Sequence, residues 1–203
     1  MIKKTVWIAP LALLAGAALI FAVRSFVVES ASAQMELSER LAQVLQGKID
    51  TIKTAEKTPG RQASETVVVT ESELESYVLF SLREQIPARV DSIDVQLTSG
   101  TVAADTKMTF GNSPTKNPLI DVLISGTHRF FVKGKLTASG GMGKFELDEA
   151  RVDGIPVPIV LIETLVDRYV KPKYPDVKLD EPFMMPWGIE DLTITNGKAT
   201  IVY

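Results

Sequence analysis

The sequence predicts an α+β fold in which a curved, mainly antiparallel sheet is wrapped around or packed on two helices. Long segments after residue 92 alternate between apolar and polar residues with a period of two, as strands with one buried face do. Two other segments repeat apolar residues at the three- and four-residue spacing of helices. The turn pair Asn196-Gly197 joins two alternating runs and indicates a hairpin. An N-terminal membrane helix and an amphipathic helix are expected before this domain.

The first 33 residues form an export or anchoring segment. Lys3 and Lys4 precede an apolar run from Val6 to Val23, and Ala31-Ser32-Ala33 is an acceptable cleavage sequence. A signal peptide carries about 7 to 15 apolar residues and a membrane span about 20, so this run lies nearer a span. Arg24 and the distance to the cleavage sequence favour an uncleaved signal anchor. We expect a single-pass protein of the plasma (inner) membrane with an extracytoplasmic domain, periplasmic or on the cell surface, or a secreted one if cleaved after Ala33.

Composition restricts what the exported part can bind. Residues 1–33 contain three of the 22 basic residues and one of the 25 acidic ones, which leaves 19 against 24 and a formal charge of −5 over 170 residues. That length suits one domain, and the charge disfavours nucleic acid, which requires a concentrated basic surface. The sequence contains no cysteine, so it has no disulfide, no catalytic thiol and no N-terminal cysteine for lipid attachment.

The elements before the sheet follow from spacing and capping. Residues 34–63 are expected to be an amphipathic helix, from Met35 to about Ala55, and a linker. The helix would pack on its own domain, act as a stalk, lie on the membrane surface or bind a partner. The first is favoured because an apolar stripe usually faces a core. Residues 64–203 are expected to form a single lipid-binding-like domain. It begins with a strand at Thr66–Val69, and Thr70 and Glu73 then fit a capping box that opens a helix ending before Pro87.

The sheet itself is predicted from period-two alternation. Two strands joined at Ser99-Gly100 and two joined at Ser139-Gly140-Gly141 are expected, followed by a helix from about Ile159 to Val170 and a terminal hairpin within 192–202. The four strands cover residues 93–97, 102–110, 129–138 and 145–152.

No constellation of catalytic or metal-binding residues is found. The only histidine is His128, in a predicted strand, so a transition-metal site would depend on carboxylates. The glycine-rich Gly140-Gly141-Met142-Gly143 lacks the ending of a phosphate loop and fits a hairpin turn. Carboxylate pairs such as Glu163 and Asp167 share a helix face and are interpreted as solvated charges. We therefore expect neither an enzyme nor a cofactor; an envelope hydrolase is the least favoured hypothesis.

Three segments resemble a known group of bacterial envelope proteins. They are VVVTESELESYV at residues 67–78, GIPVP at 154–158 and PWGIEDLTITNGKATIV at 186–202. In this order they are similar to the membrane-anchored YpmS and LmeA-like proteins, and LmeA-like members are similar to tubular lipid-binding domains. The resemblance implies a role in cell-envelope maintenance and the binding of a lipid or lipid-linked glycan. It supplies no catalytic residue.

The leading hypothesis is therefore an apolar groove that accepts acyl chains, while an ordinary filled core explains the same apolar residues. Under the second hypothesis the protein is a structural or regulatory subunit of an envelope assembly, with a protein partner. A basic rim formed by Arg129, Lys133 and Lys135 could meet a lipid headgroup, although these residues also fit the solvated face of a strand. The residues expected to line the groove are Leu74, Tyr77, Val78, Val95, Leu97, Met108, Phe110, Phe130, Val132, Leu161 and Leu165.

Overall fold

The computed structural model describes residues 37–57, 64–83, 86, 88–111, 125–167, 171, 179 and 181–203. The predicted membrane segment, including the run from Val6 to Val23, lies outside these residues. No helix in the described ranges is long and apolar enough to cross a bilayer. The elements, in chain order, are α2 (Glu39–Glu56), β1 (Thr66–Thr70), α3 (Glu71–Ser76), the π-helix η1 (Tyr77–Ser81), β2 (Ala88–Thr98), β3 (Thr101–Phe110), β4 (Gly126–Ser139), β5 (Met142–Val152), β6 (Ile155–Pro156), α5 (Ile159–Leu165), β7 (Phe183–Met184), β8 (Asp191–Thr195) and β9 (Lys198–Val202).

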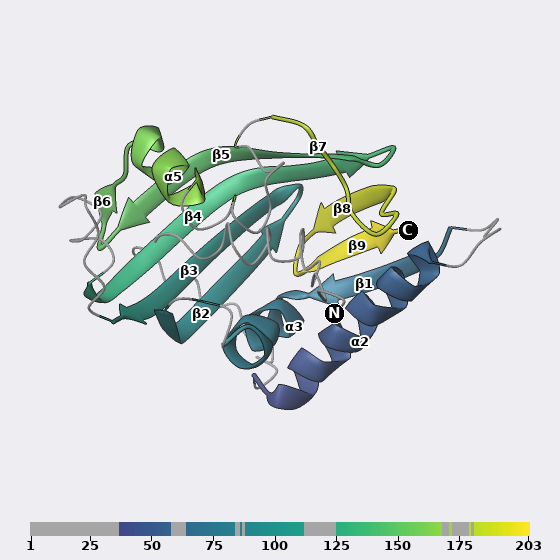
Figure 1. The fold of residues 1–203 in the computed structure, drawn as a ribbon, viewed down its shortest axis with the longest axis horizontal. Helices are drawn as coiled ribbons and strands as arrows, with labels where there is room; N and C mark the ends of the chain where they lie inside the picture. Colours follow the sequence, from purple (N-terminus) through teal and green to yellow (C-terminus); the bar gives the residue numbers. More distant parts are fainter. Residues whose placement is uncertain are drawn as a thin grey trace, which may run out of the picture.

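The strands of the described residues belong to one open, antiparallel, nine-stranded sheet with two distinct parts (Figure 1). The long-strand region contains β2, β3, β4 and β5, which are 10 to 14 residues long. The short-strand region contains β1, β9 and β8, which are five residues each. The strand register joins the two regions where Ala138 of β4 meets Leu192 of β8. Gly100 in the β2–β3 turn strengthens this junction by donating its N–H to the Ile194 carbonyl at 3.0 Å.

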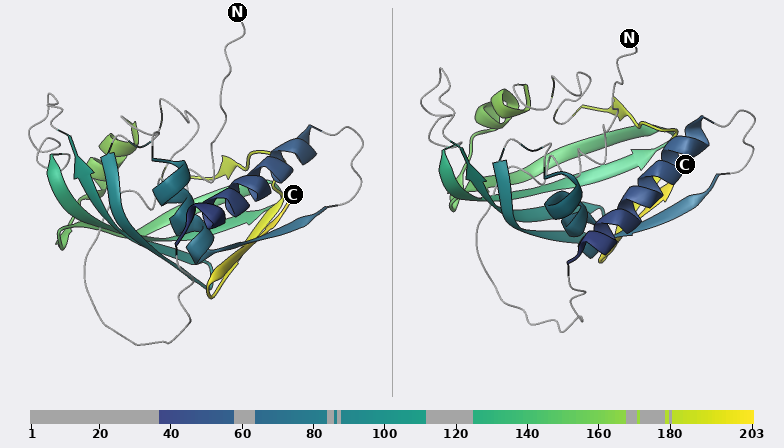
Figure 2. Two further views of the ribbon diagram at one scale, coloured as in Figure 1. Left: turned by 90° about the horizontal axis from the view of Figure 1, so that it is seen from below. Right: turned by 60° about the horizontal axis from the view of Figure 1, so that its bottom comes forward.

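The predicted fold class was wrong. The described chain is mostly a large open sheet, and this sheet is not wrapped around the two predicted helices. Figure 2 shows the sheet curving, with α2 and α3 together near one end of its inner side and α5 well apart from them. Alternation identified strand faces but could not show that β4 pairs with β3, β5 and β8.

Helix α2 packs onto its own domain through one apolar face. Its start is capped by Ser38, whose hydroxyl accepts the Leu41 N–H at 3.3 Å. Leu45, Ile49 and Ile52 are fully buried and belong to the same apolar cluster as the strand residues. The apolar face that the 3.6-residue period predicts is therefore buried against the rest of the domain.

The capping box predicted at the start of α3 is confirmed. The Thr70 hydroxyl accepts the Glu73 N–H, and the Glu73 carboxylate accepts the Thr70 N–H at 3.0 Å. The same carboxylate accepts a hydrogen bond from Lys48 Nζ of α2 at 2.5 Å. One residue therefore both begins α3 and joins it to α2.

Side chains of α2 and α3 form hydrogen bonds with backbone groups of β1 and β2, the two end strands of the main strand order. On β1, the Val68 carbonyl accepts a hydrogen bond from Lys48 Nζ at 2.6 Å. On β2, the Leu97 and Val95 N–H groups donate to the carboxylates of Glu71 and Glu75, at 2.6 and 2.7 Å. Unpaired strand edges invite pairing with other chains, so these contacts protect the edges next to the helices.

Candidate functional site

The inner face of the long-strand region is apolar. Strand register places Val95, Ala104 and Val132 in one row across β2, β3 and β4, with Ala150 of β5 beside Val132. All four are buried. Directly paired residues project to the same face of a sheet, so this row forms a continuous apolar surface.

Eight of the residues expected to line a groove are buried in the apolar cluster of the described core. Their exposed fractions lie between 1% and 6%: Leu74, Tyr77, Val78, Val95, Leu97, Met108, Phe130 and Val132. Those on α3 and η1, Leu74, Tyr77 and Val78, pack between the helices and β2 and form a filled core.

The remaining groove candidates lie elsewhere. Phe110 is half-buried at the end of β3, and Leu161 is half-buried on α5. The Leu165 side chain is outside the described part of the chain. Because α3 and α5 lie well apart (Figures 1 and 2), the structure does not bring Leu74 and Leu161 into one wall.

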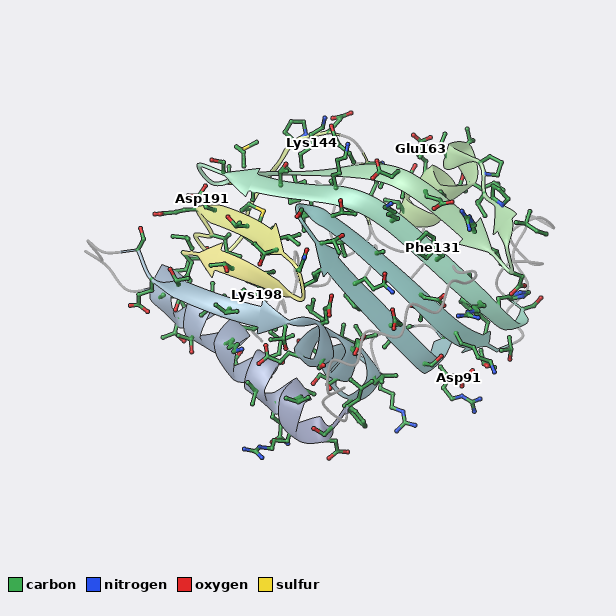
Figure 3. The ribbon with its side chains drawn as sticks, turned by 180° about the vertical axis from the view of Figure 1, so that it is seen from behind. Asp91, Phe131, Lys144, Glu163, Asp191 and Lys198 are labelled. Atoms are coloured by element: carbon green, nitrogen blue, oxygen red, sulfur yellow. The ribbon has the colours of Figure 1, made fainter. Side chains whose placement is uncertain are left out.

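The basic residues expected at a rim lie on the opposite face of the sheet. On β4, Phe130 and Val132 point inward and are buried, whereas the alternating Arg129, Lys133 and Lys135 are exposed on the outer face. Figure 3 shows this outer face, with the labelled Phe131 on it. The three cations are thus separated from the apolar face by the sheet itself.

Arg129 also has a partner on this outer face. Its Nε and one terminal nitrogen donate to the two carboxylate oxygens of Asp105, each at 2.9 Å. The hydrogen bond with Asp105 raises the pKa of Arg129 above its ordinary value. A two-point contact of this kind fixes the guanidinium and leaves it less available to a headgroup.

A polar clasp holds the end of the long-strand region that is distant from α2. Asp153, in the β5–β6 turn, accepts a hydrogen bond from His128 Nδ1 at 2.6 Å and from the Arg129 N–H at 2.8 Å. It also donates its own N–H to the Arg129 carbonyl at 2.8 Å. The other ring nitrogen, Nε2, lies 2.8 Å from the Ser125 carbonyl, which can only accept. Each ring nitrogen therefore faces an oxygen atom, and these two contacts fix the orientation of the imidazole.

The charge of Asp153 is consistent with this arrangement. Partial burial acts to raise the pKa of the carboxyl, but the hydrogen bonds from His128 and from the Arg129 N–H outweigh it, so the pKa lies below its ordinary value. Sequence reasoning assigned His128 to a strand and missed this partner, because 25 residues separate the two side chains.

Aromatic side chains lie on the inner face beside the clasp. The rings of Phe110 and Phe130 meet edge to face with centroids 5.5 Å apart, and the His128 ring lies 6.1 Å from Phe130. Phe130 is paired in register with Val152, and Val152 with Ile155. Phe130 and Val152 are buried, so this second row leads from the buried inner face to Ile155, of which 70% is exposed.

Ile155 belongs to an exposed apolar segment, residues 155–160, which we call the apolar lip. Its other prominent members are Ile159 and Val160, which are 42% and 65% exposed. From the sequence, this segment is predicted only to precede and begin a helix. Pro156 and Pro158 interrupt any period, so no buried face could be assigned to it from spacing.

A second unusual carboxyl lies between α3 and β2. Burial raises the pKa of Glu75 to about 7, against the opposing effect of the Val95 N–H, and nearby Asp94 and Glu71 raise it further. Its partner is a backbone N–H at the sheet edge. Within the described ranges, no group of three or more His, Asp or Glu side chains is placed to hold a metal ion.

No known family model matches the chain, and no curated protein is significantly similar to it.

Proposed function

We propose that this protein is a non-enzymatic, membrane-anchored protein of the bacterial cell envelope that binds a lipid or lipid-linked molecule through the apolar inner face of its long-strand region. The observation that carries the proposal is the row Phe130, Val152 and Ile155, which leads from a buried face to an exposed apolar segment. The resemblance of three segments to YpmS and LmeA-like proteins supports the same function.

The chemistry of this end suits an acyl chain. Met108, Phe110 and Phe130 provide adaptable and aromatic apolar surface. Burying each methylene is worth about 0.8 kcal/mol, so a long chain can gain substantial affinity without a charged contact. This is compatible with the position of Arg129, Lys133 and Lys135 on the opposite face, because the apolar part of the ligand would supply most of the binding energy.

Photocrosslinking tests the proposal. The full chain is reconstituted in phosphatidylethanolamine and phosphatidylglycerol vesicles that contain a phospholipid with a diazirine in its acyl chain, and the adducts are mapped by mass spectrometry. We expect adducts on Phe110, Phe130 or Ile155, at the clasped end, and none on Ile49, whose buried side chain belongs to α2 near the other end of the sheet (Figure 1).

Matched variants separate binding from proximity. Phe110→Ser should reduce adducts at Phe130 several-fold, whereas Val68→Ser, at a 40% exposed position on β1, should leave them unchanged. Adducts confined to the membrane segment, with none on β3, β4 or β6, would contradict lipid binding by this face.

A structural or regulatory role with a protein partner is the second candidate. The observation that favours it is the close burial of Leu74, Tyr77 and Val78 against α2 and β2, which is the packing of a filled core. Under this function, a protein-directed photocrosslinker on the same chain would give one defined product with a second protein. The lipid probe would give no adduct on the sheet.

A further inference from the structure

We propose that the apolar lip, residues 155–160, inserts into the outer surface of the bilayer that anchors the chain and places the adjacent clasped end of the sheet against the lipid. This inference rests on the proposed function, because it names the surface from which the ligand would reach the sheet. Its occupant is phospholipid.

The lip combines an uncharged sequence with exposed apolar side chains. From Gly154 to Ile162 the sequence contains no ionisable side chain. Ile155 and Val160 are 70% and 65% exposed. Exposed apolar patches on soluble surfaces mark sites of interaction with proteins or membranes. An uncharged segment can enter the interface without removing a charge from water.

The lip is held in a fixed position. Asp153 and Gly154 form its turn, with φ angles of +47° and +88°, as the tight two-residue turn of a hairpin requires. The Val157 N–H donates to the Ala150 carbonyl at 3.0 Å, which ties the segment to β5. Pro156 and Pro158 restrict the backbone further. Because the segment is already ordered, inserting it costs less conformational entropy than inserting a flexible loop.

The clasp fixes the base of the lip to the neighbouring strand. Asp153 bonds both to the His128 ring and to the Arg129 backbone on β4. Ile155 follows Asp153 by two residues and is paired with Val152. The clasp therefore sets the position of the exposed apolar side chains relative to the buried Phe130.

The chain outside the described part argues for a bilayer as the occupant. Thirteen residues, 24–36, separate the predicted membrane run from the first described residue. Even fully extended they reach only about 43 to 47 Å. The start of the folded domain is therefore held within that distance of the bilayer, where phospholipid is present at high local concentration.

Single-cysteine labelling tests the proposal directly, because the natural chain contains no cysteine. Val160→Cys and, as a control, Val44→Cys are each labelled with an environment-sensitive fluorophore in the full chain. Val44 is a suitable control because it is also an exposed valine on a helix, at 41% on α2. Both variants are reconstituted in phosphatidylethanolamine and phosphatidylglycerol vesicles, and circular dichroism checks that each retains its fold.

We expect the label at Val160 to shift to the blue and to be quenched at least threefold more by nitroxide-bearing lipid than the label at Val44. Quenching of the Val160 label by iodide in water, without quenching by the lipid nitroxide, would overturn the proposal. Equal lipid quenching at both positions would also contradict it, since the lip would not be the inserted segment. Shielding that appears only when envelope proteins are added would assign the lip to a protein partner instead.

The photocrosslinking experiment distinguishes the two proposals. If acyl-chain adducts form on Phe130 while the Val160 label remains in water, lipid binding stands and insertion of the lip fails. If the label enters the bilayer and no adduct forms on the sheet, the lip is a membrane contact and the proposed lipid-binding function fails.

Discussion

The strands of the short-strand and long-strand regions both alternate between buried and exposed residues, but different contacts are found at the outer end of each region. At the short-strand region, Lys48 and Glu73 join α2, α3 and β1 into one hydrogen-bonded unit. The far end of the long-strand region has instead the clasp of His128 and Asp153, followed by the exposed lip. Polar contacts thus complete the core at one end, whereas at the other they position apolar side chains that remain in solvent.

This difference shows where stability and binding can be separated. Leu45, Ile49 and Ile52 of α2 are fully buried, so changing them would alter the fold before it altered any function. Ile155 and Val160 contribute little burial, so their apolar character is not explained by the core. The comparison assigns stability to the helix-covered end and ligand contact to the clasped end.

The largest expected effect concerns the close packing of β4 on β5. A Cβ on Gly134 would lie 2.5 Å from the backbone oxygen of Glu146 and 2.5 Å from the Phe145 ring, and the backbone cannot move freely inside the sheet. Gly134→Ala should lower the free energy of unfolding by about 1 to 3 kcal/mol. Gly47→Ala is the control, because its Cβ on α2 would meet no atom within 4 Å.

Chemical denaturation of the two full-length variants in the same detergent measures this contrast. Gly47→Ala should be stabilising by about 0.5 to 1 kcal/mol, since alanine is the better helix residue. A Gly134→Ala variant as stable as the wild type would show that β4 and β5 are loosely packed and that the long-strand region is not a rigid platform.

A smaller effect is expected from pH at the contact between α3 and β2. Folding raises the pKa of Glu75 to about 7, so the folded state retains this proton more strongly than the unfolded state. The resulting stabilisation is fully present below the unfolded pKa, about 4.3 for glutamate, and is lost as pH rises to about 7. Unfolding midpoints across this window should therefore fall in the wild type.

Glu75→Gln should remove that part of the pH dependence, because its side chain cannot ionise. Glu56→Gln, at an exposed position near the end of α2, should retain it. Parallel curves for the wild type and Glu75→Gln would mean that Glu75 does not titrate in this window, and that the contact between α3 and β2 is insensitive to pH.

Local signals in the sequence predicted local structure. The capping box of Thr70 and Glu73 begins α3 as expected, and Asn196-Gly197 forms the turn of the terminal hairpin. These features depend on residues within a few positions of each other, so spacing and residue type determine them.

Features that depend on distant residues were not predicted. The clasp joins side chains 25 residues apart, and the Lys48 contact with Val68 spans 20. The branching of the sheet at Ala138 and Leu192 brings together strands more than 50 residues apart. The spacing of residues contains no sign of this pairing, and the fold class predicted from the spacing was wrong. The basic residues of β4 could be assigned to alternate positions, but the chemistry of their face depended on Asp105 of the adjacent strand.

Hydrogen–deuterium exchange tests most directly whether the clasped end is the lipid-binding end. The full chain is compared in phospholipid vesicles and in a lipid-free amphipathic polymer. Lipid should slow exchange in peptides covering residues 106–110, 126–130 and 153–160, and leave those covering 191–202 unchanged. Slower exchange confined to residues 191–202, or identical exchange in both environments, would contradict the assignment of lipid binding to the long-strand region.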